Sequence, residues 1–158
     1  MEDGLILVGV NPNYPITKYA GFDGVLWPGH ELEEPYTKNA FYPLSELEEV
    51  IFMRNGCSER DARILLVSEN NEWDKFHCIG FDVGQIDNSM SYFSCILHDI
   101  VNINGACHDL LYLLNSNGLF ENRELASNFI DRRENLPEDS VEQLGSKPIV
   151  YKLWEYIH

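Results

Sequence analysis

The chain has 158 residues, of which 44% are hydrophobic and 12% aromatic, so one domain over residues 1–158 can bury a core. Eleven Lys and Arg residues stand against 26 Asp and Glu residues, which gives a formal net charge of −15. A field of this sign repels nucleic acids and anionic lipids and attracts basic proteins. These totals argue against a nucleic-acid or membrane partner.

The compartment is predicted from the first residues and the cysteines. Met1-Glu2-Asp3-Gly4 is acidic, whereas a secretory signal has a basic segment before its apolar run. The apolar run at residues 5–10 is too short to span a bilayer. Four cysteines show neither a CxxC pair nor a framework spacing: Cys57, Cys78, Cys95 and Cys107. We therefore expect a cytoplasmic protein with free thiols.

The first third of the chain predicts a strand, an irregular segment and a helix. The apolar run at 5–10 is typical of a buried strand. Residues 11–43 combine five prolines with seven aromatics, so we expect an ordered loop that could include a small hairpin at 22–27. Ser45-Glu46-Leu47-Glu48 has the pattern of a capping box that begins a helix. Asn55-Gly56 predicts its end, with a left-handed glycine cap.

Two strands are expected in the middle of the chain. Residues 63–68 have a continuous apolar centre, which favours a central strand. We expect residues 73–83 to pair with it after a hairpin-like turn at 69–72. Gly80 and Gly84 predict a bulge or a close backbone contact near the end of the second strand.

Three helices and a final strand are expected in the last third. The helices are predicted over about 87–100, 106–115 and 122–134, the second from a stripe of apolar residues at helical spacing. Residues 149–154 predict the strand. This order indicates an α/β or α+β fold: a single layer-type domain with a small, mostly antiparallel sheet packed by about four helices.

Two His-Asp dipeptides are candidates for metal binding. His98-Asp99 and His108-Asp109 resemble the pairs of HD-type phosphohydrolases, with His77 and Asp131 as further ligand candidates. That family is all-helical, however, whereas this chain predicts a mixed fold. Ten residues also turn a helix by about 1000°, so the two pairs would lie roughly 80° apart. Polar residues on a helix surface are the simpler interpretation, and we expect no metal site and no cofactor.

Nucleophilic catalysis finds no motif either. The patterns GxSxG, GxGxxG, HExxH and the P-loop are absent from the sequence. Cys95 and His98 have helical i, i+3 spacing, but Cys95 lies on an apolar face and is expected in the core. We therefore predict no catalytic residue and a protein that is not an enzyme.

Carboxylates beside large aromatics form the pattern best suited to protein binding. Aromatic rings serve as anchors, and acids steer and pair with Lys or Arg. The predicted partner-binding residues are Glu31, Glu33, Glu34, Glu69, Glu72, Trp73, Asp74, Asp82 and Asp87. The alternative is a solvated loop whose aromatics pack onto the core.

Two segments carry a resemblance to a known family. They are Trp73…Gly80-Phe81-Asp82-Val83-Gly84…Ser91-Tyr92 and Leu114-Asn115-Ser116-Asn117-Gly118-Leu119-Phe120. Together with the small size and the acidity, they make the chain resemble bacterial immunity proteins of contact-dependent growth inhibition and related polymorphic toxin systems. The resemblance assigns a role to no residue.

The resemblance implies that the producing cell keeps this protein in its cytosol. There it would bind a basic protein toxin domain, often a nuclease, and cover the active site of the toxin. Two alternatives stay open at this point. One is a metal-dependent phosphohydrolase that uses the His-Asp pairs, and the other is a non-enzymatic adaptor whose aromatic loop docks a different partner.

Overall fold

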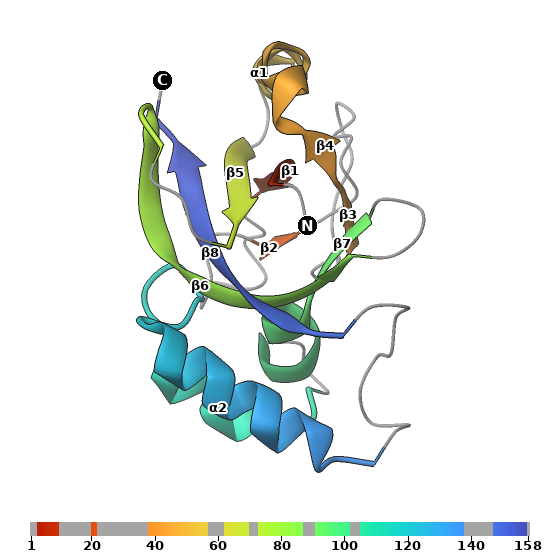
Figure 1. Ribbon diagram of the computed structural model, residues 1–158, viewed down its shortest axis with the longest axis vertical. Helices are drawn as coiled ribbons and strands as arrows, with labels where there is room; N and C mark the ends of the chain where they lie inside the picture. Colours follow the sequence, from red (N-terminus) through yellow and green to blue (C-terminus); the bar gives the residue numbers. More distant parts are fainter. Residues whose placement is uncertain are drawn as a thin grey trace.

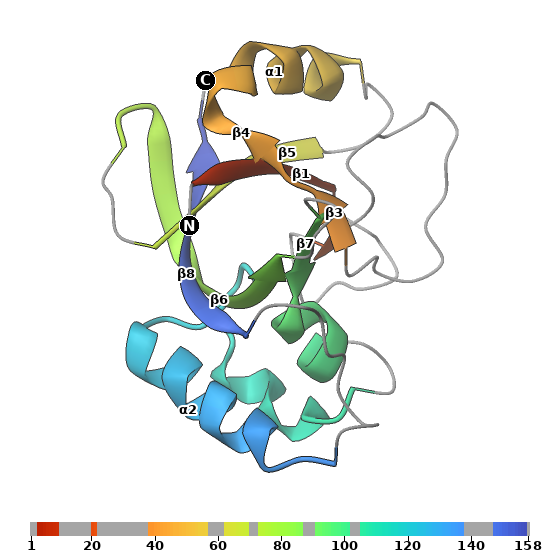
Figure 2. The ribbon, with the colours of Figure 1, turned by 45° about the vertical axis from the view of Figure 1, so that its right-hand side comes forward.

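The strands of the protein form one curled antiparallel sheet. The computed structural model describes residues 3–9, 20–21, 38–56, 62–69, 73–86, 91–101, 105–137 and 147–157. Its eight strands are β1 (Gly4–Gly9), β2 (Ala20–Gly21), β3 (Lys38–Ala40), β4 (Tyr42–Pro43), β5 (Ala62–Ser68), β6 (Phe76–Ile86), β7 (Ser91–Ser94) and β8 (Ile149–Tyr156). The strand order is β2-β1-β5-β8-β6-β7-β3, and β4 also pairs with β1. The curl brings β3 close to β1 (Figure 2).

The helices lie on two sides of this sheet. They are the 3₁₀-helix η1 (Leu44–Glu46), α1 (Leu47–Asn55), the π-helix η2 (Leu97–Val101), the 3₁₀-helix η3 (His108–Leu113) and α2 (Arg123–Glu134). Figure 1 shows α1 at one end of the molecule, over β4 and β5, and α2 at the other, against β6 and β8. This is the predicted class of fold, an α+β domain with an antiparallel sheet, although the sheet is larger than expected.

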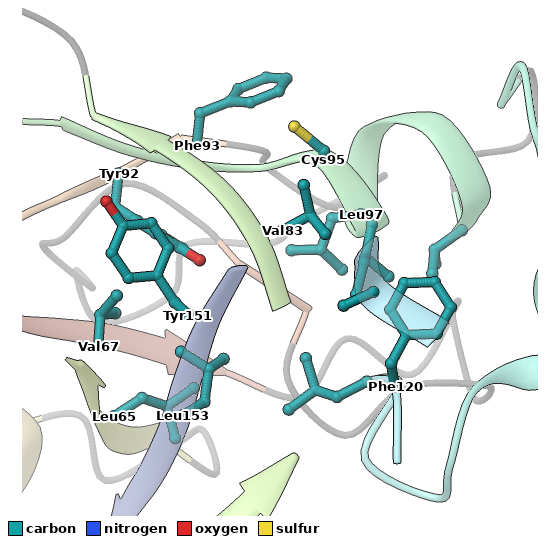
Figure 3. Packing of buried hydrophobic residues seen from close by; sticks show 14 of the residues in the cluster. Leu65, Val67, Val83, Tyr92, Phe93, Cys95, Leu97, Phe120, Tyr151 and Leu153 are labelled. Carbon is teal, nitrogen blue, oxygen red and sulfur yellow. The ribbon is translucent and has the colours of Figure 1, made fainter. Parts of the chain in front are cut away.

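The continuous apolar runs arise because alternate residues of a strand enter different cores. In β1, Leu5 and Leu7 pack in a core that includes Val50 of α1, whereas Ile6 and Val8 pack in the core that reaches α2. Successive side chains of a strand point to opposite faces, so a strand with two covered faces is apolar throughout. The same division separates Ile64, Leu66 and Trp154 from Leu65, Val67, Tyr151 and Leu153. Figure 3 shows the second group around Tyr92 and Tyr151.

The predicted pairing of the two middle strands is wrong. β8 lies between β5 and β6, so that Trp154 is paired with Leu66 on one side and with Cys78 on the other. The final strand therefore takes the central position that the predicted hairpin would have filled. The predicted irregularity at Gly80 is confirmed, because the register of β6 against β8 shifts between Cys78 and Gly80.

The predicted helix at 87–100 is also wrong at residues 91–94, and its first residues, 87–90, lie outside the described ranges. Residues 91–94 form β7, which pairs with both β6 and β3. Pairing on both edges satisfies the backbone of this segment, and such tertiary pairing overrides the local preference. The chain becomes helical only from Cys95 onward, and the next predicted helix forms as the 3₁₀-helix η3.

The predicted ends of the two α-helices have different outcomes. Asn122 caps α2, since its side chain accepts a hydrogen bond from the amide of Leu125. At α1 the capping box is not formed, because the N-cap is Glu46 and it makes no side-chain capping bond. Gly56 is right-handed with φ −76°, so the left-handed cap is also wrong. The hairpin expected at 22–27 lies outside the described residues.

Candidate interaction surface

The structure describes four of the nine predicted partner-binding residues. Asp74 is exposed. Glu69 is partly exposed, and its backbone carbonyl accepts a hydrogen bond from Arg123 of α2 at 3.0 Å. Trp73 is half-buried against the core beneath α1, with its indole nitrogen buried. The indole ring of Trp73 therefore packs toward the core of the protein. The residues outside the described ranges are Glu31, Glu33, Glu34, Glu72 and Asp87.

The prediction that Asp82 contacts a partner needs correction, because this residue is 1% exposed inside the curl of the sheet. Its Oδ2 accepts a hydrogen bond from the Tyr92 hydroxyl at 2.7 Å. Its Oδ1 accepts from the Ser94 hydroxyl at 2.9 Å and from the Val83 amide at 2.8 Å. Burial raises the pKa of Asp82 to about 6, although these hydrogen bonds oppose the shift. Asp82 is therefore a buried core residue and not a surface contact for a partner.

Asp82 belongs to a small polar site among apolar side chains. With Tyr92 and Ser94 it lines a small, partly open cavity of about 20 Å³, which has room for roughly one water molecule. The rings of Tyr92 and Tyr151 meet edge to face at 5.7 Å (Figure 3). Burial is the main cause, and the neighbouring Asp82 carboxylate the second, of a Tyr92 pKa far above its usual value. The hydroxyl therefore stays protonated and remains a hydrogen-bond donor.

Acidic side chains outnumber basic ones on the described surface. Nine are exposed: Glu46, Glu48, Glu49, Asp74, Asp109, Glu121, Glu124, Asp131 and Glu134. Of the lysine and arginine residues whose burial the structure describes, three are exposed, Lys75, Arg123 and Lys147, and the side chain of Arg132, which pairs with Asp109, is 40% exposed. Among the described residues, the exposed charge is therefore predominantly negative.

The outer side of α1 carries an exposed aromatic ring next to two carboxylates. Phe52 is 80% exposed, whereas Val50 is fully buried. Glu48 and Glu49 are exposed and precede Phe52 by four and three residues, so all three side chains share one side of the helix. Neither glutamate forms an ion pair with a described residue. We call Glu48, Glu49 and Phe52 the α1 face.

The α1 face was missed in the sequence, although its periodicity contains the signal. Leu47, Val50 and Ile51 are the apolar positions that face the sheet, and Phe52 follows Ile51 by one residue. One residue turns a helix by about 100°, which carries Phe52 out of the buried stripe. An apolar residue outside the stripe of an amphipathic helix is thus the pattern that could have identified it.

The first His-Asp pair is part of a buried ion-pair network. Asp99 is fully buried, and its Oδ2 accepts a hydrogen bond from Arg133 Nε at 2.7 Å. Its Oδ1 lies 2.6 Å from His98 Nδ1. This network joins η2 to α2 and occupies both carboxylate oxygens. The arrangement therefore ties η2 to α2 inside the protein, where Asp99 is 0% exposed.

The second His-Asp pair, His108-Asp109, contacts other residues than the first pair does. Asp109 is exposed and forms a two-bond ion pair with Arg132, with both distances at 2.8 Å. The Arg132 guanidinium lowers the pKa of Asp109. His108 Nδ1 instead lies 3.0 Å from the carbonyl of Ile100. Within the described ranges, no group of three or more His, Cys, Asp or Glu residues could hold a metal ion.

The cysteines that the structure describes are free thiols: Cys78, Cys95 and Cys107. Cys95 is fully buried, and its Sγ lies 3.7 Å from Gln85 Oε1. Burial raises the pKa of Cys95, which keeps the thiol protonated and unreactive. The prediction of a core residue is confirmed.

A polar depression of about 300 Å³ lies beside the β6 bulge, between Cys78, Phe81 and the 115–117 turn. Its walls are held by internal hydrogen bonds, since Asn115 and Asn117 both donate to the carbonyl of Ile79. These two side chains therefore fix the shape of the turn against the bulge.

Comparison with protein-family models, with curated proteins and with solved structures finds no match for this chain. In the described part of the chain, no helix is both long enough and apolar enough to cross a membrane.

Proposed function

We propose that this chain is an immunity protein, a stoichiometric inhibitor that binds a basic toxin domain. It acts in the cytoplasm of the producing cell, and the toxin is a nuclease whose groove normally holds nucleic-acid phosphates. The observation that carries the proposal is the surface charge: among the residues whose burial the structure describes, nine acidic residues are exposed against three basic ones.

Charge of this kind suits inhibition by binding. A nuclease groove displays lysine and arginine side chains that bind nucleic-acid phosphates. Carboxylates on a protein surface are negatively charged like those phosphates, so they can bind in the same groove. The long-range attraction raises the association rate, and close charge pairs then slow dissociation. Such an inhibitor needs no metal, cofactor or bond-making step, and it acts by covering the active site.

The test measures association with a basic domain at two salt concentrations. The probe is an inactivated C-terminal domain of a secreted protein encoded beside the gene for this chain, and an acidic domain of similar size is the control. We expect an association rate that falls roughly tenfold or more between 50 and 500 mM NaCl, because salt screens the electrostatic attraction that brings the two proteins together. Equal rates at both concentrations, or no binding, would contradict the proposal.

A further inference from the structure

We infer that the α1 face is the surface through which this protein docks on its basic partner, with Phe52 as the apolar anchor and Glu48 and Glu49 as the charged contacts. The inference rests on the proposed function and adds the site of contact. The partner surface that fits is a folded protein with an apolar hollow surrounded by lysine or arginine side chains.

Nothing in the described part of the fold explains the exposure of Phe52. Its side chain is 80% exposed, so it contributes little to the core that Val50 of the same helix enters. The two glutamates have a local explanation, since acids in a first turn favour the helix dipole. An exposed aromatic gains nothing from that dipole. Large aromatics of this kind are the residues that most often dominate binding when a partner covers them.

The rest of the described surface lacks this combination. Tyr112 on η3 is also 80% exposed, but the nearest acid in sequence, Asp109, is already paired with Arg132. The exposed acids of α2, Glu124, Asp131 and Glu134, have no exposed aromatic on the same helix. Helices α1 and α2 lie at opposite ends of the molecule, as Figure 2 shows, so the two surfaces can be tested separately.

Charge selects the type of occupant for the α1 face. A second copy of this chain would bring the same net charge of −15 against two glutamates that form no ion pair with a described residue. An anionic lipid surface or a nucleic acid would be repelled in the same way. A basic protein removes this repulsion and pairs with both carboxylates, while Phe52 loses its contact with water.

The structure provides matched control variants. Phe52→Ala and Tyr112→Ala each remove an equally exposed aromatic ring, one on the α1 face and one on η3. Glu48→Gln with Glu49→Gln, and Glu124→Gln with Asp131→Asn, each remove two exposed charges from one helix. Each comparison therefore removes the same type of group, an aromatic ring or two carboxylate charges, from two different positions on the molecule.

The experiment begins with photocrosslinking in the native cells. A benzophenone amino acid replaces Phe52 in one variant and Tyr112 in another, and tagged wild-type chain is purified in parallel. The captured protein is identified, produced in an inactive form, and its binding to each variant is measured. We expect a basic protein crosslinked from position 52 and not from position 112.

The binding measurements then test the energetics of the α1 face. Phe52→Ala should weaken the dissociation constant by roughly tenfold or more, mainly through faster dissociation, whereas Tyr112→Ala should leave it within about twofold. The double change at Glu48 and Glu49 should slow association and reduce its salt dependence more than the double change on α2.

The possible failures are distinguishable. If the basic protein binds wild-type chain but crosslinks from position 112, or if Phe52→Ala and Tyr112→Ala bind equally well, the α1 face is the wrong surface and the proposed function stands. If no crosslink forms at either position while a basic protein copurifies with the wild-type chain, the result is again the loss of the α1 face. If no basic protein binds the wild-type chain, the proposed function itself is wrong.

Discussion

Arg133 of α2 and Asp99 of η2 form a buried ion pair, with Nε and Oδ2 separated by 2.7 Å and side-chain exposures of 3% and 0%. The adjacent residue, Arg132, pairs with Asp109 at 2.8 Å on the surface, where the side-chain exposures are 40% and 65%. Two consecutive arginines thus each pair with an aspartate, one inside the protein and one on its surface.

This contrast predicts unequal costs for the same substitution. Arg133→Ala should lower the free energy of unfolding by about 3–5 kcal/mol, because it leaves the Asp99 carboxylate buried without its cation. Arg132→Ala should change it little, since water solvates the released Asp109. Urea unfolding of both variants measures the difference. Equal effects would show that Asp99 is stabilised mainly by its other contacts.

Two glycine-to-alanine variants compare the backbone at the β6 bulge with the backbone at the end of α1. Gly80 has φ +143°, and an added Cβ would lie 2.8 Å from the Cβ of Leu119. Gly80→Ala should therefore destabilise the protein by about 1–3 kcal/mol. Gly56 has φ −76° and 3.5 Å of space, so Gly56→Ala should stabilise it by about 0.4–1 kcal/mol. Thermal unfolding gives both values, and a neutral Gly80→Ala would contradict the strained geometry.

The features that local sequence predicted are those that depend on neighbours along the chain. The apolar runs located β1, β5 and β8, and Asn122 marked the beginning of α2. Glycine at position 80 predicted the bulge because few other residues adopt its backbone angles. Each of these signals acts over a few residues.

The missed features depend on contacts between distant segments. β8 enters the sheet between β5 and β6, and no pattern in residues 149–156 specifies those two partners. That insertion, together with β7, encloses Asp82, whose carboxylate looked like a surface group in the sequence. The α1 face is different, since helical spacing alone places Phe52 outside the buried stripe of its helix.

The buried Asp82 predicts a pH-dependent stability term with a definite sign. Its pKa rises to about 6 in the folded protein from an ordinary value of 3.8, so the folded state holds the proton more tightly than the unfolded state. This stabilising term is present at low pH and is lost as the pH rises through about 6. The loss between pH 5 and pH 8 is about 1 kcal/mol.

The variant Asp82→Asn isolates this term from those of the other carboxylates. Asparagine keeps an acceptor for Ser94 and the Val83 amide but does not titrate. The wild-type free energy of unfolding minus that of the variant should therefore fall by about 1 kcal/mol from pH 5 to pH 8. Urea titrations at four pH values measure it. A difference independent of pH would show that Asp82 keeps its ordinary pKa.

The last prediction separates the buried and exposed sides of α1. Val50 is fully buried, so Val50→Ala should cost roughly 2 kcal/mol of unfolding free energy through lost burial and the cavity that remains. Phe52→Ala, which removes a larger side chain, should change the same quantity by less than about 0.5 kcal/mol, because most of that ring is already in water. Urea unfolding of both variants at neutral pH compares them directly. If Phe52→Ala were as costly as Val50→Ala, the ring would be stabilising the fold, and the α1 face would lose the argument that its aromatic residue is there for a partner.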